Sequence, residues 1–406
     1  MKEGLLMVNV IGLGYIGLPT ALMLASSGVS VCGTDKNPEL VNKLNNGEIT
    51  FEEKGLVELF NKSRAAGISF STLPQICDMY IVAVPSPYLK ESKKLDPSYV
   101  IDAVKGVLKV APEGAIIVIE STISPGSIDR FVRPVLRECN REDVSLCHAP
   151  ERIIPGNMVY ELEHNSRTIG ADRPEVARRV KEVYESFCKG EIITTTIKTA
   201  EMTKVVENTY RDVNIAFANE LLKICRSDNM DVHEIIRIAN KHPRVNILSP
   251  GPGVGGHCIS VDPWFLVGDY PGLANIILTA RQINDSMPEY VLSRIADIKR
   301  EKGDLRVGLY GLTYKEDVDD TRESPTLQLL SKMKSNLAEP LAVYDPMVKT
   351  TMVDRQYHDI DAFLNDVDMV VIMVNHSELK NITHKLDKKV ILDTRNTGLF
   401  GGAYKL

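Results

Sequence analysis

A cysteine and an aspartate four residues apart give this sequence its clearest chemical signal. Residues 255–263 read GGHCISVDP, with a thiol at Cys258 and a carboxylate at Asp262. If a helix begins here, the two side chains lie on one face. A thiol at a helix N-terminus is an activated nucleophile, so the spacing indicates covalent catalysis. The competing interpretation is that Cys258 is a small buried residue and His257 a structural one.

A lysine, an asparagine and an arginine follow one another at helical spacing. Lys204, Asn208 and Arg211 are separated by four and three residues, which places them on one helical stripe. Such stripes usually form a solvated face, but the flanking pattern here is not that of a simple exposed face. We therefore expect Lys204 to line a pocket. A buried lysine loses proton affinity, which suits acid–base catalysis.

A glycine-rich turn near the N-terminus has the spacing of a dinucleotide fingerprint. Residues 12–17 read GLGYIG, between an expected strand and an expected helix. The first glycine permits the tight turn, the second a close approach to a pyrophosphate, and the third close packing of helix and strand. Asp35 ends the second expected strand and would accept hydrogen bonds from a ribose 2′-hydroxyl, which favours NAD over NADP. Lys36 tempers that preference, and a simple turn with an exposed aspartate is the alternative.

Two further loops follow expected strands. Residues 84–87 read VPSP and residues 120–126 read ESTISPG. Ligands of open α/β sheets bind beyond the carboxyl ends of the strands, where both loops would lie. Taken singly, each is equally well explained as a proline-stiffened loop or a helix cap.

These motifs, in this order, resemble the UDP-glucose/GDP-mannose dehydrogenase family from end to end. The resemblance is carried by the first glycine-rich unit, the EST-x-x-PG loop, the K-x-x-x-N helix, the GGHC-x-x-VDP loop and residues 311–325, GLTYKEDVDDTRESP. Within the family, residues 149–156 and 253–265 are most similar to members that oxidise UDP-N-acetyl-D-mannosamine. The family resemblance implies an NAD-dependent four-electron oxidation at the sugar C6, through an aldehyde, a thiohemiacetal and a thioester, to the uronate.

The resemblance also implies a role for individual residues. Cys258 would carry the covalent intermediates, and Lys204 would give and take a proton and stabilise the oxyanion, with Asn208 beside it. Asp262 would assist, and Glu151 would act as base in thioester hydrolysis. A covalent adduct makes chemical sense, because the carbon of an aldehyde needs a bonded nucleophile before a second hydride can leave.

The binding residues follow from the same resemblance. Arginine and lysine suit a diphosphate, and Arg244 would come from a partner subunit. Thr122 would hold an ordered water or the nicotinamide ribose. The residues expected at NAD are Gly12, Gly14, Tyr15, Ile16, Gly17, Asp35, Ser86, Thr122 and Arg322. The residues expected at the UDP-sugar are Arg152, Ile153, Lys204, Asn208, Arg211, His242, Arg244, Gly255, Tyr314, Lys315 and Arg395.

The sequence departs from the pattern of the UDP-glucose dehydrogenases at two nearby positions. UDP-glucose dehydrogenases carry a second glutamate four residues after the Glu151 position, where this chain has Pro155. Arg152 stands where those enzymes carry an aromatic residue. The departure at Pro155 weakens an assignment to UDP-glucose and leaves open how the hydrolytic water is held.

The elements that position these residues predict an α/β fold with two Rossmann-like, doubly wound domains flanking a helical central domain. Short apolar strands alternate with amphipathic helices before residue 198 and after residue 301, while the middle shows only helical periodicity. We expect a NAD-binding domain over 1–198, a central dimerisation domain over 199–300 and a nucleotide-sugar domain over 301–406. The expected strands are Leu6–Ile11, Val29–Thr34, Met79–Val84, Ala115–Glu120, one near Ile192, Val307–Tyr310, Leu341–Val343, Met369–Val374 and Val390–Asp393. The expected helices are Ile16–Ser26, Pro174–Phe187, those within 199–241, Ala274–Lys299 and Pro325–Lys334.

Composition narrows the function classes. The chain has 406 residues, 44% apolar and 25% charged, with a formal net charge of −6. That balance is typical of a globular protein and disfavours broad binding to nucleic acid or anionic membranes. Seven cysteines without a CxxC pair or metal-ligand spacing predict no metal and a reducing compartment. The apolar stretch Leu5–Leu24 is interrupted by turn glycines and Pro19, which argues against a signal peptide in this segment. We therefore expect the protein to be cytoplasmic.

Other functions compete with this one. A two-electron β-hydroxyacid or 6-phosphogluconate-type dehydrogenase shares the plan and a K-x-x-x-N pair, but needs neither Cys258 nor residues 303–406. A nucleotide-binding regulator without activity would have little use for the intact set of reactive residues. The sugar is also open, since residue types do not separate UDP-N-acetylmannosamine from UDP-GalNAc, UDP-GlcNAc, UDP-glucose or GDP-mannose.

Overall fold

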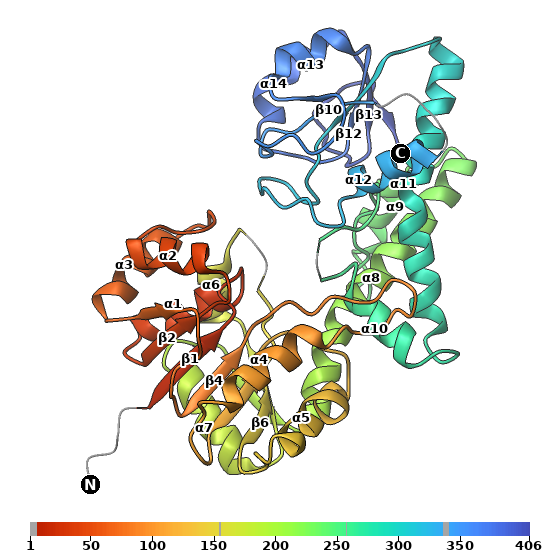
Figure 1. Ribbon diagram of the computed structural model, residues 1–406. Coiled ribbons are helices and arrows are strands. Elements are labelled where there is room, and N and C mark those ends of the chain that lie inside the picture. Colours follow the sequence, from red (N-terminus) through yellow and green to blue (C-terminus); the bar gives the residue numbers. More distant parts are fainter. Residues whose placement is uncertain (1–5, 154–155, 257, 336–340) are drawn as a thin grey trace. The chain divides into compact units, whose positions relative to one another are not determined.

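The computed structural model describes residues 6–153, 156–256, 258–335 and 341–406 (Figure 1). Two of the residues weighed above, Pro155 and His257, lie outside the described residues. The chain divides into two compact units, Met1–Glu207 and Asn208–Leu406.

The first unit is built on an eight-stranded sheet in the order β3-β2-β1-β4-β5-β6-β7-β8. Its first six strands follow the doubly wound order 3-2-1-4-5-6 and are parallel, which confirms the Rossmann-like prediction. Strand β7 departs from the parallel pattern, because it pairs antiparallel with β6. The strands are β1 Met7–Ile11, β2 Ser30–Thr34, β3 Ser69–Ser71, β4 Met79–Val82, β5 Ile116–Ile119, β6 Ser145–His148, β7 Arg167–Ala171 and β8 Ile192–Thr195.

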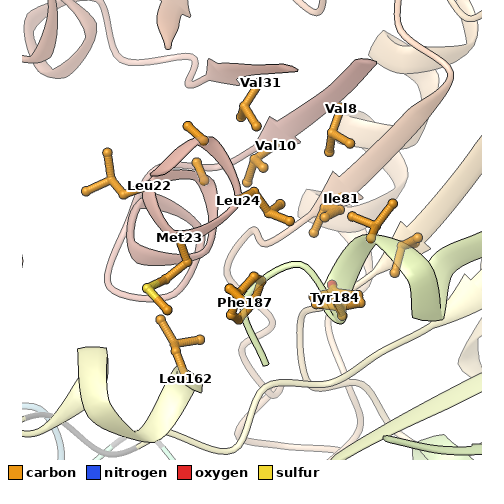
Figure 2. Close-up of a cluster of buried hydrophobic side chains, with 14 of the residues drawn as sticks. Val8, Val10, Leu22, Met23, Leu24, Val31, Ile81, Leu162, Tyr184 and Phe187 are labelled. Atoms are coloured by element: carbon orange, nitrogen blue, oxygen red, sulfur yellow. The ribbon is translucent and has the colours of Figure 1, made fainter. Parts of the chain in front are cut away.

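Helices cover both faces of this sheet, so its central strands are buried from end to end. Figure 2 shows Leu24 of α1 beside the strand residues Val10 and Ile81 and Leu22 on the other side of the helix, within one apolar cluster that also contains Tyr184. The helices are α1 Gly17–Ser26, α2 Pro38–Asn46, α3 Leu56–Ala65, α4 Ser98–Leu108, η1 Ile128–Val132, α5 Arg133–Glu138, α6 Met158–His164 and α7 Pro174–Tyr184.

A run of helices without strands separates this sheet from the next along the chain, as the periodicity predicts. The helices are α8 Ile197–Ser227, α9 Val232–Ala239, α10 Asp262–Asp269 and α11 Asn275–Lys302. The boundary between the compact units falls inside α8. The expected domain limits at residues 198 and 300 stay a prediction.

The second sheet is six-stranded and parallel, in the order β11-β10-β9-β12-β13-β14. It repeats the first glycine turn: the Gly311 amide donates to the Tyr344 carbonyl at 2.8 Å, as the Gly12 amide donates to the Thr34 carbonyl at 2.7 Å. The predicted fold class is therefore confirmed. The strands are β9 Val307–Tyr310, β10 Ala342–Tyr344, β11 Gln356–Tyr357, β12 Met369–Ile372, β13 Val390–Asp393 and β14 Tyr404–Lys405. The helices are α12 Pro325–Ser335, α13 Ile360–Asp366 and α14 Leu379–Leu386.

A buried ion pair joins α8 to α11 in the second unit. The Arg281 guanidinium is 1% exposed and donates to the Asp212 carboxylate at 2.5 Å. The Asn284 amide donates to the same carboxylate at 2.8 Å. Arg281 also pairs with Asp285, whose side chain is 43% exposed.

Removing the inner partner should be far more damaging than removing the outer one. Asp212→Ala leaves Arg281 buried without its interior carboxylate, and we expect a loss of about 3 kcal/mol or more in the free energy of unfolding. The control, Asp285→Ala, removes an exposed partner and should cost about 1 kcal/mol or less. Urea unfolding followed through Trp264, the single tryptophan, reports on this unit. Equal losses in the two variants would contradict the argument.

Candidate active site

The turn between β1 and α1 has a separate physical reason for each glycine. Gly12 has φ +92°, and a Cβ there would lie 2.5 Å from the Ala83 carbonyl oxygen. A Cβ on Gly17 would lie 1.8 Å from the Gly12 carbonyl oxygen. Gly14 is exposed, and a Cβ there would meet nothing within 4 Å. Its backbone is therefore open to a ligand, as a pyrophosphate requires.

The surroundings of this turn suit a dinucleotide. Helix α1 begins at Gly17 without a side-chain cap or an acidic residue in its first turn, so its N-terminus keeps its attraction for phosphate. The Leu13 amide donates to the Asp35 carboxylate at 2.9 Å, which holds that carboxylate beside the turn. Tyr15 and Ile16 are half-buried within it.

The two proline-containing loops lie together at the same edge of the sheet. The Ser121 hydroxyl, after β5, donates to the Val84 carbonyl, after β4, at 2.6 Å. Ser86 is buried and Thr122 is half-buried. The structure thus brings the glycine turn and both predicted loops to the carboxyl ends of β1, β4 and β5, and the residues there fit NAD.

A buried arginine that the sequence analysis missed connects Glu120 with Glu151. The Arg167 guanidinium donates to a Glu120 oxygen at 3.1 Å and to the Glu151 carboxylate. All three residues are at most 7% exposed. The only available signal was a charged residue at the start of a strand that is otherwise uncharged, RTIGA.

The residues after Glu151 have partners of their own. The Arg152 guanidinium pairs with Glu207 and donates to the Ser166 carbonyl at 2.7 Å. Ile153 is buried. In this unit Arg152 is therefore held by an acidic side chain, and a role at the sugar stays a prediction.

Helix α8 presents the predicted lysine and asparagine as buried side chains. Lys204 is 7% exposed and Asn208 is 6% exposed, whereas Arg211 is exposed. One turn before Lys204, the Glu201 carboxylate accepts the Gly126 and Ile128 amides at 2.5 and 2.9 Å. Burial raises the pKa of Glu201 to about 7. This contact fixes the start of α8 against the loop that carries Thr122.

The condition that a helix begins at Cys258 is not met. Helix α10 begins at Asp262, and residues 259–261 form a turn in which the Asp262 amide donates to the Cys258 carbonyl at 2.9 Å. Pro263 is the reason: it suits the first turn of α10, but its ring would clash with the Ile259 carbonyl inside a longer helix. The Cys258 residue is exposed, and the Asn208 amide donates to the Asp262 carboxylate at 2.6 Å.

The glycines before Cys258 permit close packing against the segment 313–325. A Cβ on Gly255 would lie 2.6 Å from the Glu323 carbonyl oxygen, and one on Gly256 would lie 2.8 Å from the Tyr314 ring. The Gly256 amide donates to the Arg322 carbonyl at 2.9 Å. Burial raises the pKa of Tyr314 to about 12. The structure thereby gathers Gly255, Tyr314 and the cysteine loop within the second unit.

The remaining predicted residues of the second unit are more dispersed. Arg322 is exposed and pairs with Asp320 at 2.6 Å, and Lys315 is half-buried. Arg395 lies beside Gly251, and burial lowers the pKa of its guanidinium. The exposed His242 and Arg244 lie close together, with the Arg244 amide donating to the His242 ring at 3.3 Å.

Among the described residues, no group of three or more histidine, cysteine, aspartate or glutamate side chains could hold a metal ion. No helix in the described ranges is long and apolar enough to cross a membrane.

The open space at Gly14 gives a direct test of the dinucleotide cradle. Gly14→Ala should leave the thermal stability of the apo protein unchanged and weaken NAD binding about tenfold or more, because the methyl group occupies the path of the pyrophosphate. The comparison variant, Gly17→Ala, should lower thermal stability because of its clash with Gly12. Fluorescence titration with NADH and thermal melts separate the two effects. Wild-type affinity in Gly14→Ala would show that the nucleotide lies elsewhere.

Comparisons with known proteins cover nearly the whole chain. Residues 6–188, 198–286 and 308–398 match the NAD binding, central and UDP binding domains of the UDP-glucose/GDP-mannose dehydrogenase family. A UDP-N-acetyl-D-mannosamine dehydrogenase from Methanococcus vannielii is 42% identical over 97% of this chain and 94% of its own. An NDP-N-acetyl-D-galactosaminuronic acid dehydrogenase from Ralstonia nicotianae is 39% identical over 96% and 95%. The solved UDP-N-acetyl-mannosamine dehydrogenase of Staphylococcus aureus is 42% identical, covers 98% of both chains and has a TM-score of 0.88. The chain therefore belongs to the UDP-glucose/GDP-mannose dehydrogenase family.

Proposed function

We propose that this protein oxidises the C6 alcohol of UDP-N-acetyl-D-mannosamine to the uronate in two successive two-electron steps. The observation that carries the proposal is the exposed Cys258 residue, four positions before Asp262, whose buried carboxylate is hydrogen-bonded to Asn208. The similarity to UDP-N-acetyl-D-mannosamine dehydrogenases over nearly the full length supports the choice of sugar. NAD, when bound, supplies the hydride acceptor for both oxidations.

In this proposal the residues of α8 and the cysteine loop handle protons and the covalent bond. Lys204 takes the proton of the C6 hydroxyl and later stabilises the oxyanion. The Cys258 thiolate adds to the aldehyde carbon and forms the thiohemiacetal, which becomes a thioester in the second oxidation. Asn208 and Asp262 hold each other in place through their hydrogen bond.

Hydrolysis of the thioester completes the reaction. A water oxygen bonds to the acyl carbon, its proton passes to Glu151, and the carbon–sulfur bond breaks to release the Cys258 thiolate. Thr122 holds an ordered water or the nicotinamide ribose. Both residues follow strands of the first sheet, where rigid elements support precise placement.

The second unit supplies most of the groups proposed for the nucleotide. Tyr314, Lys315 and Arg395 contact the UDP, and Gly255 allows the sugar to approach the backbone. The other residues proposed at the sugar nucleotide are Arg152, Ile153, Arg211, His242 and Arg244. The 39% identity to an NDP-N-acetyl-D-galactosaminuronic acid dehydrogenase makes the UDP-N-acetylgalactosamine epimer the second candidate substrate.

We also propose a homodimer formed through α8. The helix exposes Tyr210, Phe217 and Ile224, which are 63%, 54% and 52% exposed in one subunit. They follow one another at intervals of seven residues, which places them on one face of the helix, as a helix–helix interface requires. In the dimer, Arg244 reaches the sugar nucleotide of the partner subunit. We place the protein in the cytoplasm, because its seven cysteines form no disulfide, which suits a reducing compartment.

The yield of NADH tests the reaction. Wild type should form about two NADH per limiting UDP-N-acetylmannosamine, because both oxidations end in hydride transfer. Cys258→Ala should fail to complete the second oxidation, while Cys139→Ala, at the other exposed cysteine, should match wild type. Absorbance at the NADH band measures the yield, and UDP-N-acetylgalactosamine is run beside it. About one NADH from wild type would support a two-electron dehydrogenase instead.

The mass in solution tests the dimer. Light scattering after a sizing column should give about twice the 45.1 kDa of one chain for wild type. Phe217→Glu places a charge on the apolar stripe and should give the monomer mass. Leu273→Glu changes a residue that is 81% exposed and lies outside α8, and should remain dimeric. A monomeric wild type would rule out the dimer.

A further inference from the structure

Three ionisable side chains are buried together at the carboxyl edge of the first sheet. Glu120 follows β5, Glu151 follows β6 by three residues, and Arg167 begins β7. Their exposed fractions are 1%, 7% and 3%. Arg167 lies with its guanidinium 4.2 Å from the ring centre of Tyr184, which excludes water from that side.

One guanidinium serves two carboxylates in this cluster. Arg167 donates one nitrogen to Glu120 and another to Glu151. The Tyr184 hydroxyl donates to the same Glu120 oxygen at 3.1 Å, while the second Glu120 oxygen is buried without a hydrogen-bond partner. Two negative charges and one positive charge in a dry site are costly, so one carboxyl group is expected to retain a proton.

Glu120 is the group that retains the proton. Burial, together with the smaller effect of the Glu151 charge, raises the pKa of Glu120 to about 7 against the opposing effect of Arg167. The groups that face Glu120 are Arg167 from β7, Glu151 from the loop after β6, Tyr184 from α7 and Thr20 from α1. The Tyr184 hydroxyl, which donates to Glu120, favours the ionised form.

The charge on Glu120 governs how firmly Arg167 holds Glu151. While Glu120 is protonated, the guanidinium charge is left to Glu151, and the Glu151 carboxylate is tied up in an ion pair. Once Glu120 ionises, the two carboxylates compete for one guanidinium. The hold on Glu151 then weakens, which leaves its carboxylate able to accept a proton.

We propose that Glu120 is a positioning residue for thioester hydrolysis, acting through Arg167 to release Glu151 as the base. This inference rests on the proposed function, in which Glu151 accepts the proton of the attacking water while the carbon–sulfur bond to Cys258 breaks. Neither hydride transfer needs Glu120. Its effect is therefore confined to the last step.

The test follows hydrolysis as a function of pH. Rapid-mixing absorbance separates a fast burst of two NADH per active site from the later turnover that waits for hydrolysis. In wild type the hydrolysis rate should rise between about pH 6 and pH 8 as Glu120 ionises. Glu120→Gln keeps an oxygen for Arg167 and Tyr184 but cannot ionise. Its hydrolysis should be slow and independent of pH in that interval, with an unchanged burst.

The pH dependence of the free energy of unfolding also reports on the proton held by Glu120. Because the folded pKa of Glu120 is raised from 4.5 to about 7, its contribution to stability is present at low pH and lost as pH rises through about 7. Glu120→Gln should remove that part of the pH dependence in urea unfolding. Should Glu120→Gln fail to fold, Tyr184→Phe serves as the second variant, because it removes one hydrogen-bond donor to the ionised Glu120. The pH at which the hydrolysis rate rises should then be higher than in wild type.

The outcomes distinguish this inference from the function on which it rests. The role of Glu120 alone would be overturned if wild type gives a burst of two NADH but hydrolysis has the same pH profile in wild type and Glu120→Gln. It would also be overturned if the rise of the hydrolysis rate occurs at the same pH in Tyr184→Phe as in wild type. A wild type without a burst of two NADH would overturn the proposed function itself.

Discussion

Helix α8 carries a series of buried polar side chains that are held by partners from other elements. Glu201 caps the amides of Gly126 and Ile128 in the first unit. In the second unit, Asn208 bonds to Asp262 and Asp212 to Arg281. Each contact fixes the rotation of the helix about its own axis, since an unpaired buried charge costs several kcal/mol. Lys204 lies between Glu201 and Asn208 along the helix. These two contacts therefore set the direction in which its side chain leaves the helix.

The same type of glycine turn follows the first strand of each sheet, but its surroundings differ between the two. In the first, the Asp35 carboxylate is half-buried beside an exposed Gly14, which leaves the turn open to a dinucleotide. In the second, the corresponding Asp345 is 2% exposed and holds two loop amides. The Asp317 amide donates to Nδ1 of His376 at 3.0 Å, so Nε2 carries the hydrogen and donates to Asp345. His376 thus closes the second turn, consistent with the match of this segment to a UDP binding domain.

Sequence periodicity predicted the fold where strands are apolar and bounded by turns. Val307–Tyr310 and Val390–Asp393 were predicted to the residue, whereas β3, β11 and β14 are too short for a pattern. The site was harder. The bonds of Arg167 join residues 47 and 16 positions away, and no local pattern reports which strands become neighbours. The start of α10 at Asp262 follows from Pro263, which suits the first turn of a helix and disfavours a helix that begins at Cys258.

Capture of the acyl-enzyme tests the covalent mechanism most directly. The Glu151→Gln variant lacks the proposed hydrolytic base, so incubation with NAD and UDP-N-acetylmannosamine should accumulate the thioester. Intact mass and peptide mapping should find the sugar nucleotide on Cys258 and on none of the other six cysteines. NADH formation with an unmodified Cys258, or with the acyl group on another residue, would contradict the account.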